Sequence, residues 1–469
     1  MTSNYKISVT FGFLLLFVYT LIFISTNGGI IGLESVRVLG YFAIIQLVYT
    51  VLSWHSIKNT WLDAYLIFTA ALYSFMLAQP MMEALEISVP FRRLWDGGFG
   101  ITYSAYYQAT YYSMLCCIFF HFGALLSTKK RLLTTKFNDL SLKPMKKFAI
   151  FMAIISFPFF IYSLSLQITV VQAFGYAALY DWEEYTSRFV MIMADFFIPS
   201  LLVLFCDSII KDKHVKFYAA LVVVLVFIPP FFLGGRSDAM ISIAIFGVVY
   251  ASVKRVKPKH IILTIATGVL MLYAMNIVGQ IRSGNERSLE IVKSSISNNE
   301  DNPVYKTLEE MGWSMFPTIK TIEVVPKVYD YSYGGSYFWA LVSVIPNVGF
   351  WEGVHPGKEN DPGYKLGEYV NLGYGMGYSI VAGTYNEFGY LGFILMFIYG
   401  YYFSRIFMFI SRRTIYERPV QFILAVLFLW FSLKFVRNSY DSMVRNVFFY
   451  IIPMYIIARL GSRYKKVSV

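Results

Sequence analysis

Five arginines lie beside apolar segments, in places where a charged side chain needs an explanation. They are Arg236, Arg282, Arg287, Arg437 and Arg445. A guanidinium group stays protonated and binds a phosphate through two parallel hydrogen bonds, so such a set suits a substrate that carries a pyrophosphate. For any single arginine, the alternative is a structural ion pair or a contact with lipid headgroups. As a group, the five predict a site for an anionic substrate.

Arg236 stands in a Gly-Gly-Arg-Ser-Asp turn at 234–238, between two apolar runs. Paired glycines permit a tight turn and a close approach of the backbone to a ligand. Ser237 or Asp238 can cap the following helix, whose N-terminus attracts an anion. The turn is therefore the strongest single candidate for phosphate binding.

Two side chains near the later arginines could act as a general base. Glu387 opens onto an apolar segment, where a carboxylate is costly and is therefore a functional candidate. Burial would raise its pKa toward the range that suits a base. The alternative for Glu387 is an ion pair with one of the arginines. His355 is the second candidate base, and its alternative is that of a solvated loop residue.

The stretch 331–392 is rich in glycine and tyrosine. Tyr378 and Tyr385 stand in its most glycine-rich part, before a late apolar run. A tyrosine offers a flat apolar face and a hydroxyl, which suits contact with sugars. Tyrosine also favours the membrane interface, and the sequence leaves both interpretations open.

The elements that must position these residues are membrane helices. The chain of 469 residues is 57% hydrophobic and only 14% charged, and its mean hydropathy is +0.56. Apolar runs of the length needed to cross a bilayer recur along it. We predict an all-α polytopic membrane protein with about twelve spans: 7–26, 36–54, 61–82, 104–127, 148–168, 189–210, 215–233, 238–253, 260–279, 389–410, 419–436 and 446–460. The first run is expected to be a span rather than a signal peptide.

The distribution of lysine and arginine predicts the orientation. Basic residues gather in five loops or tails, which all fall on one side if there are twelve spans: 128–147, 211–216, 254–259, 412–418 and 459–466. The positive-inside rule makes that side cytoplasmic, with both termini inside. The chain then divides into spans 1–9 over 1–279, one large outer loop over 280–388, and spans 10–12 with a cytoplasmic tail over 389–469.

Several classes of site have no signature in the sequence. There is no Walker-type phosphate loop, and no histidine and cysteine spacing typical of a metal site. The three cysteines all lie in apolar runs. The net charge of +12 is explained by the cytoplasmic loops and does not indicate nucleic acid. We therefore expect neither a cofactor nor a metal ion.

The chain resembles the Wzy-type O-antigen and polysaccharide repeat-unit polymerases of bacteria. The resemblance rests on the Gly-Gly-Arg-Ser turn at 234–237, the segment from Gly377-Tyr378-Ser379 to Glu387-Phe388-Gly389, and the loop from Arg437 to Arg445. The plan of about twelve spans with one large late outer loop is similar as well. The resemblance implies a GT-C-like membrane glycosyltransferase at the outer face of the plasma membrane.

Such enzymes join undecaprenyl-pyrophosphate-linked oligosaccharides into O-antigen, capsular or exopolysaccharide chains without a nucleotide sugar. The resemblance also implies a co-polymerase that regulates chain length. With this function, Arg236 and Arg282 are expected to stabilise the leaving pyrophosphate, and Glu387 or His355 to accept the proton. Arg287, Arg437, Arg445, Tyr378 and Tyr385 are expected to bind pyrophosphate or glycan. The alternatives are an O-antigen ligase, which uses the same donor, and a lipid-linked oligosaccharide flippase or other transporter.

Overall fold

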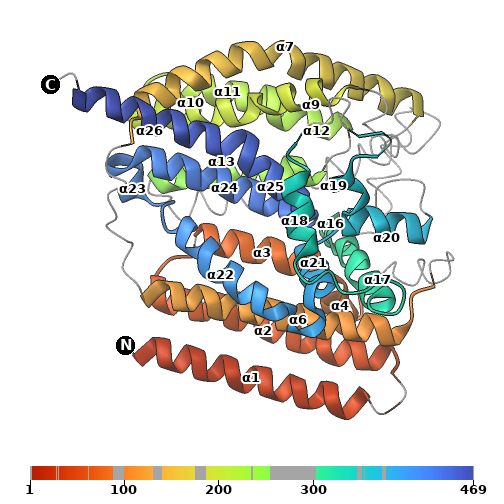
Figure 1. The fold of residues 1–469 in the computed structure, drawn as a ribbon. Coiled ribbons are helices and arrows are strands. Elements are labelled where there is room, and N and C mark those ends of the chain that lie inside the picture. The colour runs from red at the N-terminus through yellow and green to blue at the C-terminus, as the bar shows by residue number, and fades with distance from the viewer. Residues whose placement is uncertain are drawn as a thin grey trace, which may run out of the picture. The chain divides into compact units, whose positions relative to one another are not determined.

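The computed structural model describes residues 3–27, 29, 31–61, 63–87, 100–129, 140–174, 186–233, 236–253, 303–345, 351–352, 354–371 and 377–467. All regular elements within these ranges are helices (Figure 1). The chain forms two compact units. Unit 1 comprises Met1–Thr134, Leu308–Met408 and Phe431–Asn446, and unit 2 comprises Thr135–Thr307, Phe409–Trp430 and Val447–Val469.

Seven described helices are long and apolar enough to cross a membrane: Asn4–Thr26, Leu33–Lys58, Tyr103–Lys129, Leu142–Phe174, Phe189–Lys211, Ile380–Phe407 and Tyr440–Ser462. An eighth candidate is the pair α3 (Ala64–Met76) and α4 (Ala78–Ala84), which is bent by 69°. The prediction of an all-helical membrane protein is confirmed over the part of the chain that the structure describes.

The predicted spans relate to these helices in four ways. Seven of the twelve predicted spans overlap the seven long helices, and 61–82 corresponds to the bent pair. The predicted spans 215–233, 238–253 and 419–436 correspond to shorter apolar helices, Val215–Val226, Ala244–Val253 and Pro419–Phe435. The span at 260–279 lies outside the described residues. The total of twelve therefore stays a prediction.

Unit 1 is built around α6 (Tyr103–Lys129), whose residues are mostly buried. It packs along α22 (Phe393–Phe407) and also contacts α1 (Ser3–Asn27) and α2 (Leu33–Lys58). Glycines permit the close approach of α6 and α22, since a Cβ on Gly123 would overlap the carbonyl of Phe397. A Cβ on Gly400 would likewise overlap the carbonyl of Phe120. Small residues at a helix contact are how membrane helices gain van der Waals packing.

Unit 2 contains α7 (Leu142–Phe174), α9 (Arg188–Asp195), α10 (Phe197–Lys211), α11 (Val215–Val222), η3 (Val223–Phe227), α12 (Ile228–Leu233), α13 (Arg236–Val253), α23 (Arg412–Glu417), most of α24 (Pro419–Phe435), η6 (Val447–Ile451) and α26 (Ile452–Val467). The buried carboxylate of Asp207 joins α7 to α10. It accepts from Lys146 at 2.7 Å and from Lys211 at 2.6 Å.

The predicted large loop is largely helical where it is described. It contains α16 (Pro303–Gly312), η4 (Trp313–Met315), α17 (Phe316–Val324), α18 (Gly335–Val342), α19 (Pro356–Glu359), α20 (Pro362–Val370) and α21 (Ile380–Phe388), and η5 (Gly389–Gly392) follows it directly. Two boundaries also differ from the predicted ones. The span expected at 389 begins at Ile380, and the span expected at 446 begins with α25 (Tyr440–Asn446). Glu387 therefore lies in the last turn of α21 and Arg445 lies in α25, rather than in the loops before the predicted spans.

Candidate functional site

The Gly-Tyr-Ser motif at 377–379 begins the helix that carries Glu387. Gly377 has a φ of +69°, which favours glycine, and Ser379 accepts a hydrogen bond from the backbone N–H of Ala382 at 2.9 Å. Ser379 is thus the N-cap of α21. Tyr378 is only 3% exposed, and its hydroxyl lies 3.1 Å from that of Thr321 on α17. The motif fixes where α21 starts and how it packs on α17.

Glu387 lies in the last turn of α21 and is fully buried. Its carboxylate accepts a hydrogen bond from the backbone N–H of Gly334, which is the N-cap of α18. The backbone N–H of Ser336 also faces it. A helix N-terminus carries unpaired N–H groups and a partial positive charge, so it stabilises a carboxylate there. The described partners of Glu387 are therefore N–H groups at the start of α18 and the hydroxyl of Ser336.

The end of α21 holds the turn before α18 through further hydrogen bonds. The N–H of Ser332 donates to the carbonyl of Asn386 at 2.9 Å, and the N–H of Tyr333 to the carbonyl of Glu387 at 3.2 Å. The side-chain amide of Asn386 donates to the hydroxyl of Ser332 at 2.8 Å. Gly389 ends the helix with a φ of +57°, where a Cβ would lie 2.8 Å from the hydroxyl of Tyr331. The Glu-Phe-Gly motif thus fixes the turn at 331–336.

Three tyrosine hydroxyls connect α18, α22 and α25. The hydroxyl of Tyr337 lies 2.5 Å from that of Tyr399 and donates to that of Tyr440 at 3.1 Å. Gly383 permits α21 to approach this group, since a Cβ there would lie 2.8 Å from the hydroxyl of Tyr440. Burial raises the pKa of Tyr337 to about 12, so it stays a hydrogen-bond donor at neutral pH. These hydroxyls connect α25, which carries Arg445, to α18, whose N-terminal N–H groups face Glu387.

Two carboxyl groups face each other near the start of α25. Asp441 accepts hydrogen bonds from the hydroxyl of Ser439 and from the N–H of Ser442, and its other oxygen lies 3.9 Å from Arg445. Asp361 is the N-cap of α20, and Ser439 also hydrogen-bonds to it. Burial and the charge of Asp441 raise the pKa of Asp361 from 3.8 to about 7. Asp361 can therefore exchange a proton near neutral pH.

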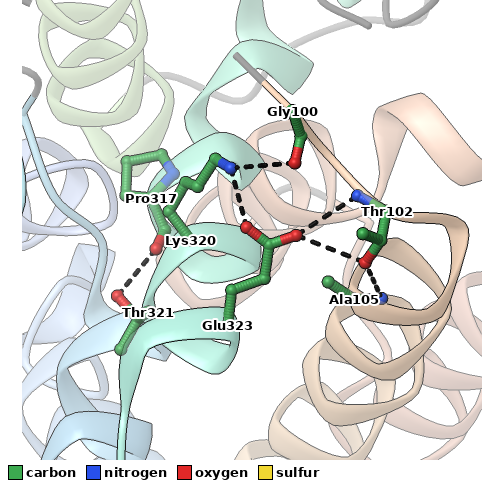
Figure 2. A network of polar contacts seen from close by, with 7 residues as sticks. All are labelled: Gly100, Thr102, Ala105, Pro317, Lys320, Thr321 and Glu323. Atoms are coloured by element: carbon green, nitrogen blue, oxygen red, sulfur yellow. Dashed lines mark hydrogen bonds and ion pairs between the residues drawn. The ribbon is translucent and has the colours of Figure 1, made fainter. Parts of the chain in front are cut away.

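A buried ion pair joins α17 to the start of α6 (Figure 2). Lys320 is only 7% exposed, and its ammonium lies 2.7 Å from Glu323 and 3.3 Å from the carbonyl of Gly100. The other oxygen of Glu323 accepts from the N–H and the hydroxyl of Thr102 at 3.2 and 3.3 Å. Both charges therefore have partners, as burial requires, and the pair fixes α17 against α6.

The other predicted site residues lie in varied surroundings. Both ring nitrogens of His355 are engaged, Nδ1 as acceptor from Gly357 and Nε2 against the carbonyl of Ile345, each at 2.9 Å. Tyr385 is 4% exposed, so it is a core residue like Tyr378. Arg437 is partly buried, with its guanidinium 5.9 Å from the ring of Phe75.

The three arginines that come earlier in the sequence belong to unit 2. Arg236 is the first residue of α13, and no side-chain geometry is described for it. Arg282 and Arg287 lie outside the described residues. The structure therefore brings Glu387, Arg437 and Arg445 into one unit, and the roles of all the predicted site residues stay predictions.

A sequence model of the O-antigen polysaccharide polymerase Wzy family matches residues 7–466, which is nearly the whole chain. The chain belongs to the Wzy family. No curated protein and no solved structure matches it. The family supports an O-antigen polymerase role in the membrane. The resemblance that the sequence motifs indicated is confirmed.

Several residues near the Wzy-family motifs were not singled out from the sequence. Asp361 carried a weak signal, since Asp-Pro-Gly is typical of a helix start. Nothing local to it showed that Asp441, eighty positions later, would face it. Nothing in the sequence distinguished Lys320, which is buried. Tyr333 was one of many tyrosines in the stretch 331–392, and its distinctive feature is its backbone conformation.

Proposed function

We propose that this Wzy-family protein joins undecaprenyl-pyrophosphate-linked oligosaccharide repeat units into O-antigen, capsular or exopolysaccharide chains at the outer face of the plasma membrane. The observation that carries the proposal is the set formed by Asp361, Ser439, Asp441 and Arg445. It combines a carboxyl that exchanges a proton near neutral pH with a guanidinium group, at the end of a helix long enough to span a membrane.

The donor side of the reaction needs positive charge. When the acceptor oxygen displaces the lipid pyrophosphate from the sugar carbon, negative charge grows on the leaving group. Fixed guanidinium groups in a site of low dielectric stabilise that charge before it forms. We assign this work to Arg445 and Arg437. From the sequence, Arg236 and Arg282 stay candidates for the same work, with Arg287 as a further ligand.

The acceptor side needs a proton acceptor for the attacking hydroxyl. Of the carboxyl groups described in this part of unit 1, Asp361 combines a pKa near 7 with partial exposure. A base works best when its pKa lies near the working pH. We assign the proton transfer to Asp361, and Ser439 and Asp441 hold its position. His355 binds backbone groups through both ring nitrogens, and Glu387 binds the N–H of Gly334 through one carboxylate oxygen, so we assign positioning roles to both.

The orientation follows the positive-inside pattern, with both termini in the cytoplasm and α25 beginning at the outer side. The lipid carrier would reach the site from the bilayer, and a separate protein would regulate the chain length. The chain itself carries the transfer, and neither a metal ion nor a nucleotide sugar enters the proposed mechanism.

The test is complementation in a host that lacks this protein, with the surface glycan separated by size on a gel. Wild type should restore a ladder of long chains, whereas Arg445→Ala should lower polymerisation by about 10²- to 10³-fold, as loss of one anion-stabilising donor does. Arg445→Lys should rescue only in part, because lysine lacks the planar fork. Arg413→Ala is the matched control, since Arg413 is exposed and pairs only with Glu417 among the described residues.

The deletion strain itself separates the alternatives. Single repeat units on the surface indicate a polymerase defect, and long chains left on the carrier indicate a ligase. No glycan at the outer face indicates a transporter. A full ladder with Arg445→Ala at normal protein level would contradict the assigned role of Arg445.

A further inference from the structure

The turn before α18 has an unusual residue at its apex. Tyr333 has a φ of +45° and is followed by Gly334 with a φ of +94°, while the N–H of Gly335 donates to the carbonyl of Ser332 at 2.7 Å. Two successive positive φ angles and this hydrogen bond are the features of a type I′ turn. Such turns favour glycine, asparagine or aspartate at the first central position. A tyrosine there occupies a backbone conformation that is costly for a bulky side chain.

The packing of the Tyr333 side chain does not explain why tyrosine stands there. Tyr333 is 72% exposed, so its ring contributes little to a core. Its edge contacts are with Tyr331, at a ring separation of 6.0 Å, and with Phe388, at 6.3 Å. Phe388 is itself 37% exposed. The turn therefore presents a small aromatic surface outward, composed of Tyr333, Phe388 and the partly buried Tyr331.

The rest of the turn is fixed in place. Asn386 and Glu387 hold it through the bonds to Ser332, Tyr333 and Gly334 described above. The buried Glu387 thus secures the backbone on both sides of the exposed ring. Strained residues persist where the surrounding structure determines their conformation, and they gather at binding sites.

We propose that Tyr333 is a saccharide-stacking residue and that Glu387 is its positioning residue. The inference rests on the proposed function, and it names the contact that the sequence assigned to Tyr378 and Tyr385. Those two are buried, whereas Tyr333 offers a free aromatic face and a hydroxyl to a sugar ring. Lys327 and Asp330 on the same segment are exposed, so this segment faces water and suits a hydroxyl-rich ligand.

The strained backbone gives a test that separates binding from folding. Tyr333→Gly removes the ring but relaxes the turn, because glycine adopts positive φ without cost. Its melting temperature should equal or exceed that of wild type, while glycan binding falls. Tyr333→Phe keeps the flat face and should bind nearly as wild type does. Asn59→Gly is the matched control, since exposed Asn59 also has a positive φ of 51° but ends α2.

The probe is the host's single repeat-unit oligosaccharide, released from its carrier, with the full-length protein purified in lipid nanodiscs. Binding is followed by saturation-transfer NMR, and polymerisation of the lipid-linked unit is measured in the same preparation. We expect Tyr333→Gly to weaken binding by about tenfold, the size of one aromatic contact. Glu387→Ala should weaken it similarly, and Glu387→Gln should restore most of it, because the amide oxygen can still accept from Gly334.

Three results would overturn the inference: unchanged binding with Tyr333→Gly, equal loss with Tyr333→Phe, or no binding of the free oligosaccharide by wild type. A variant that binds glycan normally but is lost from the membrane fraction would instead place Tyr333 in the lipid interface, which also overturns it. Failure of wild type to elongate the lipid-linked unit counts against the proposed function, while oligosaccharide binding decides the role of Tyr333 separately.

Discussion

Glu387 and Asp361 are carboxyl groups of the same unit that face different polar groups. Glu387 is fully buried, but it faces the backbone N–H groups that begin α18. Asp361 keeps partial exposure and accepts the N–H of Tyr364, yet it also faces the carboxylate of Asp441. Burial acts on both carboxyl groups, so the comparison teaches that they differ in the groups that face them, which are amide donors at Glu387 and a second carboxylate at Asp361.

The sharpest way to break this comparison is Asp361→Asn. Asparagine caps a helix as well as aspartate does, so α20 should keep its start. If Asp361 accepts the proton, polymerisation should fall by about 10²- to 10⁴-fold, measured as chain length and rate in membranes. Asp361→Ser, which also caps but cannot take up a proton, should lose as much. Wild-type ladders from both variants would leave Asp361 with a capping role only.

The same experiment on Glu387 should give a smaller effect. Glu387→Gln keeps an acceptor for the N–H of Gly334, so we expect a rate loss below about tenfold, the value of ~1.4 kcal/mol in an equilibrium. Glu387→Ala should lose more, because it leaves N–H groups of α18 unpaired. A loss of a hundredfold or more in Glu387→Gln, with normal melting behaviour, would restore Glu387 as the general base.

The influence of Asp441 on Asp361 can be measured through pH. The base must be ionised, so the wild-type rate should rise with pH up to about 7. Asp441→Asn removes the like charge and should lower the pKa of Asp361. The rise of the rate with pH should then occur about one pH unit lower. The rate of the variant relative to its own plateau should then exceed that of wild type at pH 6. If the rise occurs at the same pH in both proteins, a group other than Asp361 controls the rate.

The smallest expected effect is on stability. The pKa of Asp361 is raised in the folded state, so the folded chain binds the extra proton between pH 4 and 7 and loses stability as pH rises through that window. The free energy of opening measured by hydrogen exchange at the α20 amides should fall by about 1 to 2 kcal/mol between pH 4 and 7. The effect is smaller than the full pKa shift would give, because Asp361 is partly exposed to solvent. Asp361→Asn should remove this dependence of stability on pH. The same slope of stability against pH in wild type and variant would contradict the assignment to Asp361.

Much of the fold was readable from the sequence, because a bilayer demands long apolar helices and each long helix overlaps a predicted span. The errors lie where caps decide a boundary. Ser379 starts α21 within the stretch that was assigned to the large loop, and this places Glu387 in a helix rather than in a loop before a span.

The site was less predictable, since its contacts join distant positions. Arginine and glutamate were identified by type, but Asp361 meets Asp441 across eighty residues, and the conformation of Tyr333 depends on hydrogen bonds to Asn386 and Glu387. The surroundings of His355 were equally hard to predict. A histidine in a polar stretch was expected to be a base or solvated, yet it binds two backbone groups.

Unit 1 is assembled from segments that are far apart in the chain, and this has a consequence for biosynthesis. α6 contacts α22, and the hydroxyls of Tyr112 and Thr384 meet at 3.0 Å across 272 positions of chain. At 5–20 residues per second, the ribosome needs roughly 14 to 54 s to supply the partner. During that interval the polar side chains of α6 stand in the bilayer without their final neighbours. The early helices of this protein therefore need shielding by the insertion machinery until the second half of the chain arrives.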